Sequence, residues 1–101
     1  MARITFISRM TIKAGHEATF ERIVTDLQKR VNAEERDIVY FEFFKLREPR
    51  RYAVLESFPH EEAEHAHMNG PILAHVIQRI VDCVDGTWER EYLDALTEET
   101  R

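Results

Sequence analysis

The sequence predicts an α+β fold in which an antiparallel four-stranded sheet carries helices on one face. Three observations lead to this prediction. Four short stretches rich in β-branched and aromatic residues alternate apolar with other residues, whereas two longer stretches repeat their apolar residues every three or four positions. These stretches follow one another in the order β-α-β-β-α-β. Only a short turn around Pro49 separates the two middle strands, which predicts a hairpin.

The first strand and the first helix have the clearest patterns. Residues 3–12 form the predicted strand RITFISRMTI, which the chain leaves near Gly15. One side of this strand carries Ile4, Phe6, Ser8 and Met10. Residues 16–33 then form a predicted amphipathic helix, because apolar side chains recur on one helical face. That face carries Phe20, Ile23, Val24, Leu27 and Val31.

The second half of the chain repeats the pattern with a broken helical segment. The hairpin strands are predicted over residues 38–46 and 51–58, and the polar stretch HEEAEHAH is predicted to be helical. Pro71 suits the first turn of a new helix, because its missing N–H costs nothing there. The new helix has a broad apolar face of Ile72, Leu73, Val76, Ile77, Ile80, Val81 and Val84. Residues 87–96 alternate as the last strand.

This order is that of the ferredoxin-like sandwich, which leaves one face of its sheet uncovered. The second strand carries aromatic residues on both of its faces. We expect Tyr40 and Phe44 to face the helices, and Val39, Phe41 and Phe43 to lie on the uncovered face. Such a contiguous apolar patch is uncommon on a monomer. The sequence therefore predicts a homodimer whose open sheet faces pack together around Val39, Phe41 and Phe43.

Size, charge and cysteine content exclude several classes of protein. We expect residues 1–101 to form a single domain, with its core at about residues 3–93. A net charge of −5 with scattered basic residues argues against nucleic acid as a partner. Neither a membrane span nor a leader is expected, which predicts a cytoplasmic protein. Cys83, the only cysteine, lies in an apolar run and is expected to be a buried structural thiol.

Three segments resemble the antibiotic biosynthesis monooxygenase family: TIKAGHEATFERI, DIVYFEFFKLREPRRYAVLESF and HEEAEHAHMNGPIL. The resemblance covers about residues 3–93. The matching positions are Gly15 with Phe20, the strand residues Val54, Leu55, Glu56 and Phe58, and His67 with Pro71. Because members of this family are dimeric α+β barrels built from ferredoxin-like protomers, the resemblance implies the same assembly for this chain.

Two positions depart from the family's pattern. A second His often follows the Pro, where this chain has Ile72, and a Trp often stands in the strand, where it has Phe58. Haem-degrading members need an Asn, a Trp and an axial His, and the matching positions here are Ser8, Phe58 and approximately Ile77. A shifted register could bring His75 to the axial position, but the Asn and Trp would still be missing. Haem degradation is therefore disfavoured.

The histidines near residue 65 raise the question of a metal site. His65 and His67 point about 200° apart on a helix, so they cannot bind one ion together. His60, Glu64 and His67 share a face and form a tolerable mixed ligand set. The same residues are typical of a solvated helix face, which is the favoured interpretation. We therefore predict no metal, and assign no role to His60, His65 or His75.

His67 and Glu56 are the leading candidates for chemistry. An imidazole in an apolar pocket can take a proton from an acidic phenol or an activated C–H group, and a histidine that merely stabilises the helix break fits His67 equally well. Glu56 should share a sheet face with Val54 and Phe58. An acid among apolar neighbours has either a raised pKa or a paired cation, for which Arg9 and Arg90 are the candidates.

The family resemblance implies a cofactor-independent monooxygenase that oxidises a quinol, phenolic or polyketide-like aromatic with O₂. His67 would be the base, with Ser8 and Glu56 as orienting groups. The expected substrate-binding residues are Tyr40, Phe58, Met68 and Trp88. No GxGxxG motif, P-loop or cysteine cluster is present, and no cofactor is expected. The alternatives are a non-catalytic dimer that binds a small apolar molecule and an isomerase that uses the same base without oxygen.

Overall fold

The computed structural model of the chain describes residues 3–97. Its strands and helices follow the predicted order, and each lies within two or three residues of its expected position. They are β1 (Ile4–Thr11), α1 (Glu17–Glu34), β2 (Tyr40–Lys45), β3 (Arg51–Phe58), α2 (Glu61–Met68), α3 (Pro71–Cys83) and β4 (Glu89–Leu93). The helical segment before β4 is divided in two, because α2 ends at Met68 with Asn69 as its cap, and Pro71 begins α3.

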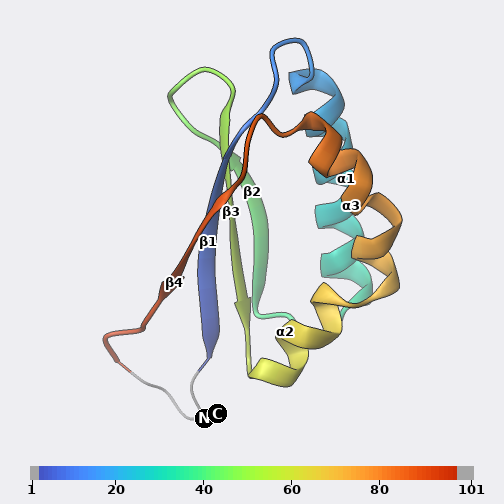
Figure 1. Cartoon of the computed structure of the whole chain (residues 1–101). Coiled ribbons are helices and arrows are strands. Elements are labelled where there is room, and N and C mark those ends of the chain that lie inside the picture. Colours follow the sequence, from blue (N-terminus) through green and yellow to red (C-terminus); the bar gives the residue numbers. More distant parts are fainter. Residues whose placement is uncertain (1–2, 98–101) are drawn as a thin grey trace.

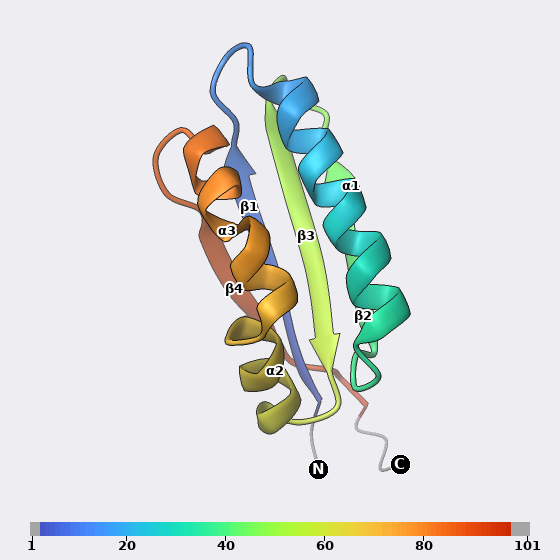
Figure 2. The ribbon, with the colours of Figure 1, turned by 90° about the vertical axis from the view of Figure 1, so that its right-hand side faces the viewer.

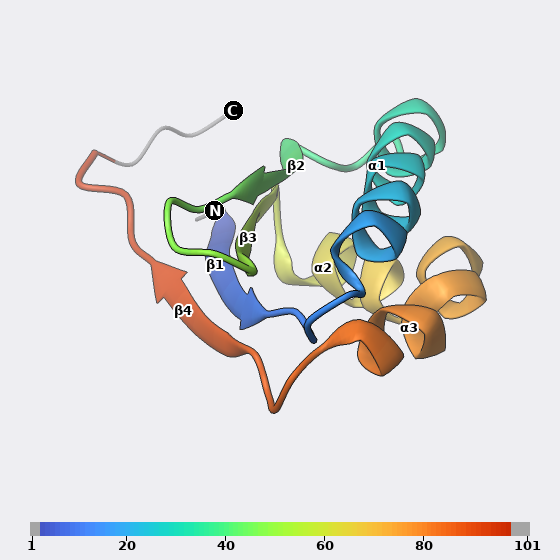
Figure 3. The ribbon, with the colours of Figure 1, turned by 90° about the horizontal axis from the view of Figure 1, so that it is seen from above.

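The four strands form one antiparallel sheet in the order β2-β3-β1-β4. Helices α1 and α3 lie side by side over one face of this sheet, and α2 covers one end of it (Figures 1 and 2). The predicted α+β ferredoxin-like fold is confirmed. Viewed along the strands, β4 leads away from the helices (Figure 3).

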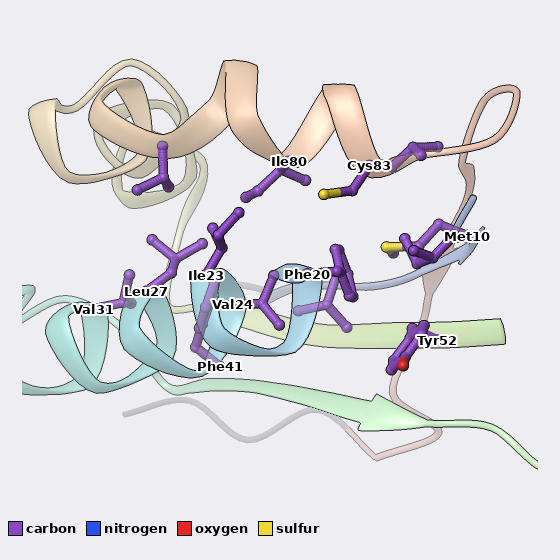
Figure 4. Packing of buried hydrophobic residues seen from close by; sticks show 14 of the residues in the cluster. Met10, Phe20, Ile23, Val24, Leu27, Val31, Phe41, Tyr52, Ile80 and Cys83 are labelled. Carbon is purple, nitrogen blue, oxygen red and sulfur yellow. The ribbon is translucent and has the colours of Figure 1, made fainter. Parts of the chain in front are cut away.

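Apolar side chains of α1, α3 and the sheet fill the space between the helices and the sheet (Figure 4). All five apolar positions predicted for α1 are buried, as are Met10, Tyr52 and Val54 on the facing strands. Cys83 is 3% exposed, which confirms the buried thiol, and burial raises its pKa. None of the helices between residues 3 and 97 has both the length and the apolar character of a membrane span.

The structure corrects the predicted orientation of β2. Phe41 is 3% exposed in the core beneath the helices, and Phe43 packs against the same core. Tyr40 and Phe44 are 38% and 40% exposed on the uncovered side of the sheet. The prediction had these two pairs reversed. Val39 lies just before β2 and is 49% exposed, so of the three residues proposed for the dimer contact it alone is exposed.

The error has a simple physical cause. Because β2 carries aromatic residues on both faces, alternation along β2 alone could not show which face meets the helices. Pairing with β3 decides this, since Phe41 lies opposite Glu56 and Phe43 lies opposite Val54. Both of these β3 residues point toward the helices, so Phe41 and Phe43 must do the same.

The uncovered face of the sheet, called the open face below, is partly apolar. It presents Ile7, Tyr40, Phe44, Leu55 and Leu93. Ile7 and Leu55 lie directly opposite each other on neighbouring strands. Charged side chains lie on the same face, as in the 3.1 Å ion pair between Arg9 and Glu91. The open face therefore combines apolar and charged side chains.

Candidate active site

A cavity of about 90 Å³ lies between the sheet and the helices. Most of its wall is apolar, with Phe41, Leu73, Ile77 and Trp88 among the lining side chains. Its polar lining residues are Ser8, Glu56, His67 and Arg90. All three residues predicted to take part in chemistry, namely Ser8, Glu56 and His67, thus line the same space.

His67 enters the cavity from the last turn of α2. His60 precedes the helix as its N-cap: its Nδ1 accepts the N–H of Ala63 at 3.2 Å. Ala63 and His67 are four residues apart and share the buried face. The His67 ring is 3% exposed, and its centroid lies 5.2 Å from that of Phe41 and 5.6 Å from that of Phe58.

The His67 ring also contacts Glu35, a residue that the sequence analysis did not identify. Its Oε1 lies 2.8 Å from Nδ1 of His67, within hydrogen-bonding distance. Glu35 follows α1 as its C-terminal cap, where its backbone N–H donates to the carbonyl of Val31. The two side chains come from positions 32 residues apart. Nothing in the sequence around Glu35 distinguishes it from the glutamates of α1 that precede it.

Glu56 is the second ionisable group in the cavity. It is 6% exposed, and its Oε1 has no hydrogen-bond partner. That atom lies 3.7 Å from Nε2 of His67. Burial raises the pKa of Glu56 to about 8; Arg90 opposes the rise, whereas repulsion from Glu64 and Glu35 adds to it. At neutral pH most Glu56 side chains are therefore protonated and able to donate a hydrogen bond.

Arg90 rather than Arg9 is the cation near Glu56. Arg9 lies on the open face, paired with Glu91. Arg90 lies directly opposite Ser8 across the β1–β4 pair, and its Nε donates to Ser8 Oγ at 3.3 Å. The guanidinium carbon also sits 4.1 Å from the centre of the Phe6 ring.

The helix face that raised the question of a metal site makes other contacts. Nδ1 of His60 is used in the helix cap, and Glu64 accepts a hydrogen bond from the Tyr92 hydroxyl at 2.9 Å. Nδ1 of His67 contacts Glu35. Between residues 3 and 97, no three His, Cys, Asp or Glu side chains are grouped so that they could hold a metal ion.

Two of the four residues expected to bind substrate line the cavity, and two do not. Met68 and Trp88 line the cavity. Phe58 is 1% exposed and does not line the cavity, but its ring packs against that of His67. Tyr40 lies on the open face instead, because the predicted orientation of β2 was reversed. Phe41, which had been assigned to the dimer contact, takes its place in the cavity wall.

Comparison with known proteins gives a family and a fold. The family model described as antibiotic biosynthesis monooxygenase matches residues 3–79. No curated protein matches the sequence.

Solved structures share the fold at low sequence identity. A Caulobacter crescentus CB15 protein provisionally named an antibiotic biosynthesis monooxygenase is 23% identical, with a TM-score of 0.89 over 95% of this chain and 92% of that one. A Nitrosomonas europaea protein of unknown function is 21% identical, with a TM-score of 0.81 over 100% and 96%. A Bacteroides thetaiotaomicron protein with the same provisional name as the first is 17% identical, with a TM-score of 0.82 over 99% and 95%.

Proposed function

This chain belongs to the antibiotic biosynthesis monooxygenase family, and we propose that it oxidises a quinol, phenolic or polyketide-like aromatic with O₂ without a bound cofactor. The observation that carries the proposal is that Nε2 of His67 lies 3.7 Å from Oε1 of Glu56, an atom without a hydrogen-bond partner, in a largely apolar cavity. A base and a neutral acid side by side suit a substrate that must lose a proton before it reacts.

His67 is the proposed base. A substrate hydroxyl or activated C–H group placed at Nε2 would give its proton to the imidazole. Glu56, held neutral by burial, would donate a hydrogen bond to the oxygen on which negative charge develops. Ser8 and Arg90 would orient the substrate from the sheet side of the cavity.

The proposed reaction needs no external reductant. The substrate anion passes one electron to O₂, and the resulting radical and superoxide combine to form a C–O bond. The peroxide takes the proton back from His67, and cleavage of its O–O bond with loss of the remaining C–H proton releases water. The CH₂ carbon of an anthrone, or of the keto tautomer of a quinol or phenol, and O₂ thus become a carbonyl group and H₂O. Exclusion of water by the apolar wall would protect the radical pair until it combines.

The size of the cavity limits the substrate. Pockets that bury drug-sized ligands measure roughly 300–1000 Å³, well above the volume of about 90 Å³ here. We therefore place one-ring and two-ring aromatics ahead of larger polyketides. Phe41 and Trp88 would pack against the flat ring, and Met68 is unbranched and could adjust its shape to it.

We also propose that two copies pack their open faces together, as expected for a member of this family. The contact would centre on Ile7, Tyr40, Phe44 and Leu55 instead of the residues predicted from the sequence. These apolar side chains would be shielded from water by the self-complementary contact of a two-fold dimer. Because the cavity lies on the opposite side of the sheet, each copy would keep its own site.

Oxygen uptake tests the proposed reaction. It would be followed by electrode over a panel of quinols, catechols and anthrones with a metal chelator present. His67→Ala should lower turnover by roughly 10²- to 10⁴-fold, the usual contribution of a general base. His65→Ala is the matched control, because His65 lies on the same helix but is exposed.

The alternatives give different results. Conversion of a substrate without oxygen consumption would identify an isomerase. Tight binding of panel compounds without conversion would identify a non-catalytic binding protein. Either outcome, or full turnover in His67→Ala, would contradict the proposed monooxygenase mechanism.

A further inference from the structure

The His67 ring separates two spaces of different character. Toward the sheet it lines the inner cavity, where Nε2 faces Glu56. Toward the solvent it lines an outer groove of about 350 Å³ between the end of α1 and the α2–α3 junction. Glu35 lies in that groove with its side chain 21% exposed, and contacts the other ring nitrogen. The two ring nitrogens therefore face different carboxyl groups: Nδ1 faces Glu35, and Nε2 faces Glu56.

A neutral imidazole carries one N–H, and its neighbours determine which nitrogen holds the hydrogen. The 2.8 Å separation between Nδ1 and Glu35 Oε1 is typical of an N–H donating to a carboxylate. The 3.7 Å separation between Nε2 and Oε1 of Glu56 is too long for a hydrogen bond. Hydrogen bonding therefore favours the ring form with the hydrogen on Nδ1.

We propose that Glu35 is a positioning residue, which holds His67 in the Nδ1-protonated form and so turns the lone pair of Nε2 into the cavity. Its role in turnover rests on the function proposed above, but its effect on the imidazole does not. Glu35 reaches the ring from the outside of the molecule and does not line the cavity, so it orients the base without touching substrate.

The side chain of Glu35 can be changed without removing its backbone contact to α1. Its cap contact to Val31 uses the backbone, so Glu35→Gln leaves α1 intact and keeps the side-chain volume. The amide can present either its oxygen or its NH₂ group to Nδ1, so it no longer selects one tautomer. Glu34→Gln is the matched control, because Glu34 is the preceding residue and pairs with Arg30 on the surface.

Nitrogen-15 NMR of the histidine side chains would measure the tautomer ratio of His67 at a pH where the ring is neutral. The His67 signals would be assigned by their absence from the spectrum of His67→Gln. We expect the Nδ1-protonated form to predominate in wild type and in Glu34→Gln. In Glu35→Gln its ratio to the Nε2-protonated form should fall about tenfold, the usual scale of one hydrogen bond. Backbone amide spectra would establish that the variant is folded.

Two NMR results would overturn the proposal: predominance of the Nε2-protonated form in wild type, or an unchanged ratio in Glu35→Gln. Oxygen uptake provides a separate measurement. If wild type consumes oxygen, Glu35→Gln should lower kcat with little change in KM, because only the base is misoriented; an unchanged kcat would count against the proposal. If wild type consumes none, the proposed reaction fails, while the NMR ratio still tests Glu35.

Discussion

Nε2 of His67 lies 3.7 Å from Oε1 of Glu56, at the boundary between α2 and the sheet. Among residues 3–97, that glutamate oxygen is the one buried side-chain nitrogen or oxygen atom without a hydrogen-bond partner. An unpartnered acid is costly to bury, and such sites are concentrated where a protein binds or transforms a ligand. This relationship has consequences for stability as well as for chemistry.

Glu56 should make the wild-type protein lose stability as the pH rises. Between about pH 4.5 and 8, folded Glu56 keeps a proton that the unfolded chain has released. The free energy of unfolding should therefore fall by about 1.4 kcal/mol per pH unit relative to Glu56→Gln, which cannot titrate. Urea unfolding of both proteins from pH 5 to 8, at one protein concentration, would measure the difference. Parallel stability curves would show that the pKa of Glu56 is not raised.

Arg90 should limit how far the pKa of Glu56 rises. Its positive charge favours the ionised carboxylate, so Arg90→Leu should move the pKa of Glu56 further upward. Carbon-13 NMR of the glutamate carboxyl groups would follow this titration. Arg9→Leu is the control, since Arg9 pairs with Glu91 on the open face and should leave Glu56 unaffected. Equal titrations in wild type and Arg90→Leu would contradict this assignment.

The proposed dimer can be tested on the open face. Phe44→Asp places a charge among the apolar side chains of this face, and burial of an unpaired charge should prevent association. Sedimentation at micromolar concentration should change from about twice 12.0 kDa to a single 12.0 kDa species. Val81→Asp is the control and should leave the dimer intact, because Val81 is 45% exposed on α3, away from the open face. Wild type that sediments only at 12.0 kDa would eliminate the dimer.

Gly70 should be required at the junction of α2 and α3. A Cβ atom at this position would lie 2.7 Å from the backbone oxygen of Ala66, too close unless the helix end moves. We expect Gly70→Ala to lower the free energy of unfolding by ~1–3 kcal/mol, as for other overpacked sites. Because His67 belongs to the same helix end, its contact with Glu35 should weaken too.

Denaturant unfolding would measure the cost of Gly70→Ala against that of Asn69→Ala. Asn69 is the neighbouring residue, and its side chain makes one exposed hydrogen bond to the carbonyl of His65. Removing that bond should cost less than about 1 kcal/mol. Similar losses in the two variants would mean that the close approach at Gly70 is relieved without strain.

The candidate site was predictable only in part. Glu56 follows from its alternation with Val54 and Phe58, and His67 follows from the family resemblance; both line the cavity. Glu35 carried no signal, because its contact with His67 joins the end of one helix to another helix 32 residues away. The sequence offered Arg9 and Arg90 as examples of a cation near Glu56, and the pairing of β4 with β1 places Arg90 there.

The sequence by itself determined the order of the strands and helices, their approximate ends and the buried face of α1. These features depend on periodicity, which is a local property of the chain and can be read from neighbouring residues. Only the tertiary structure decided which face of β2 meets the helices and which acid contacts His67. Both depend on strand pairing and helix packing between distant segments, where side chains of similar type compete for the same position and only the assembled geometry distinguishes them.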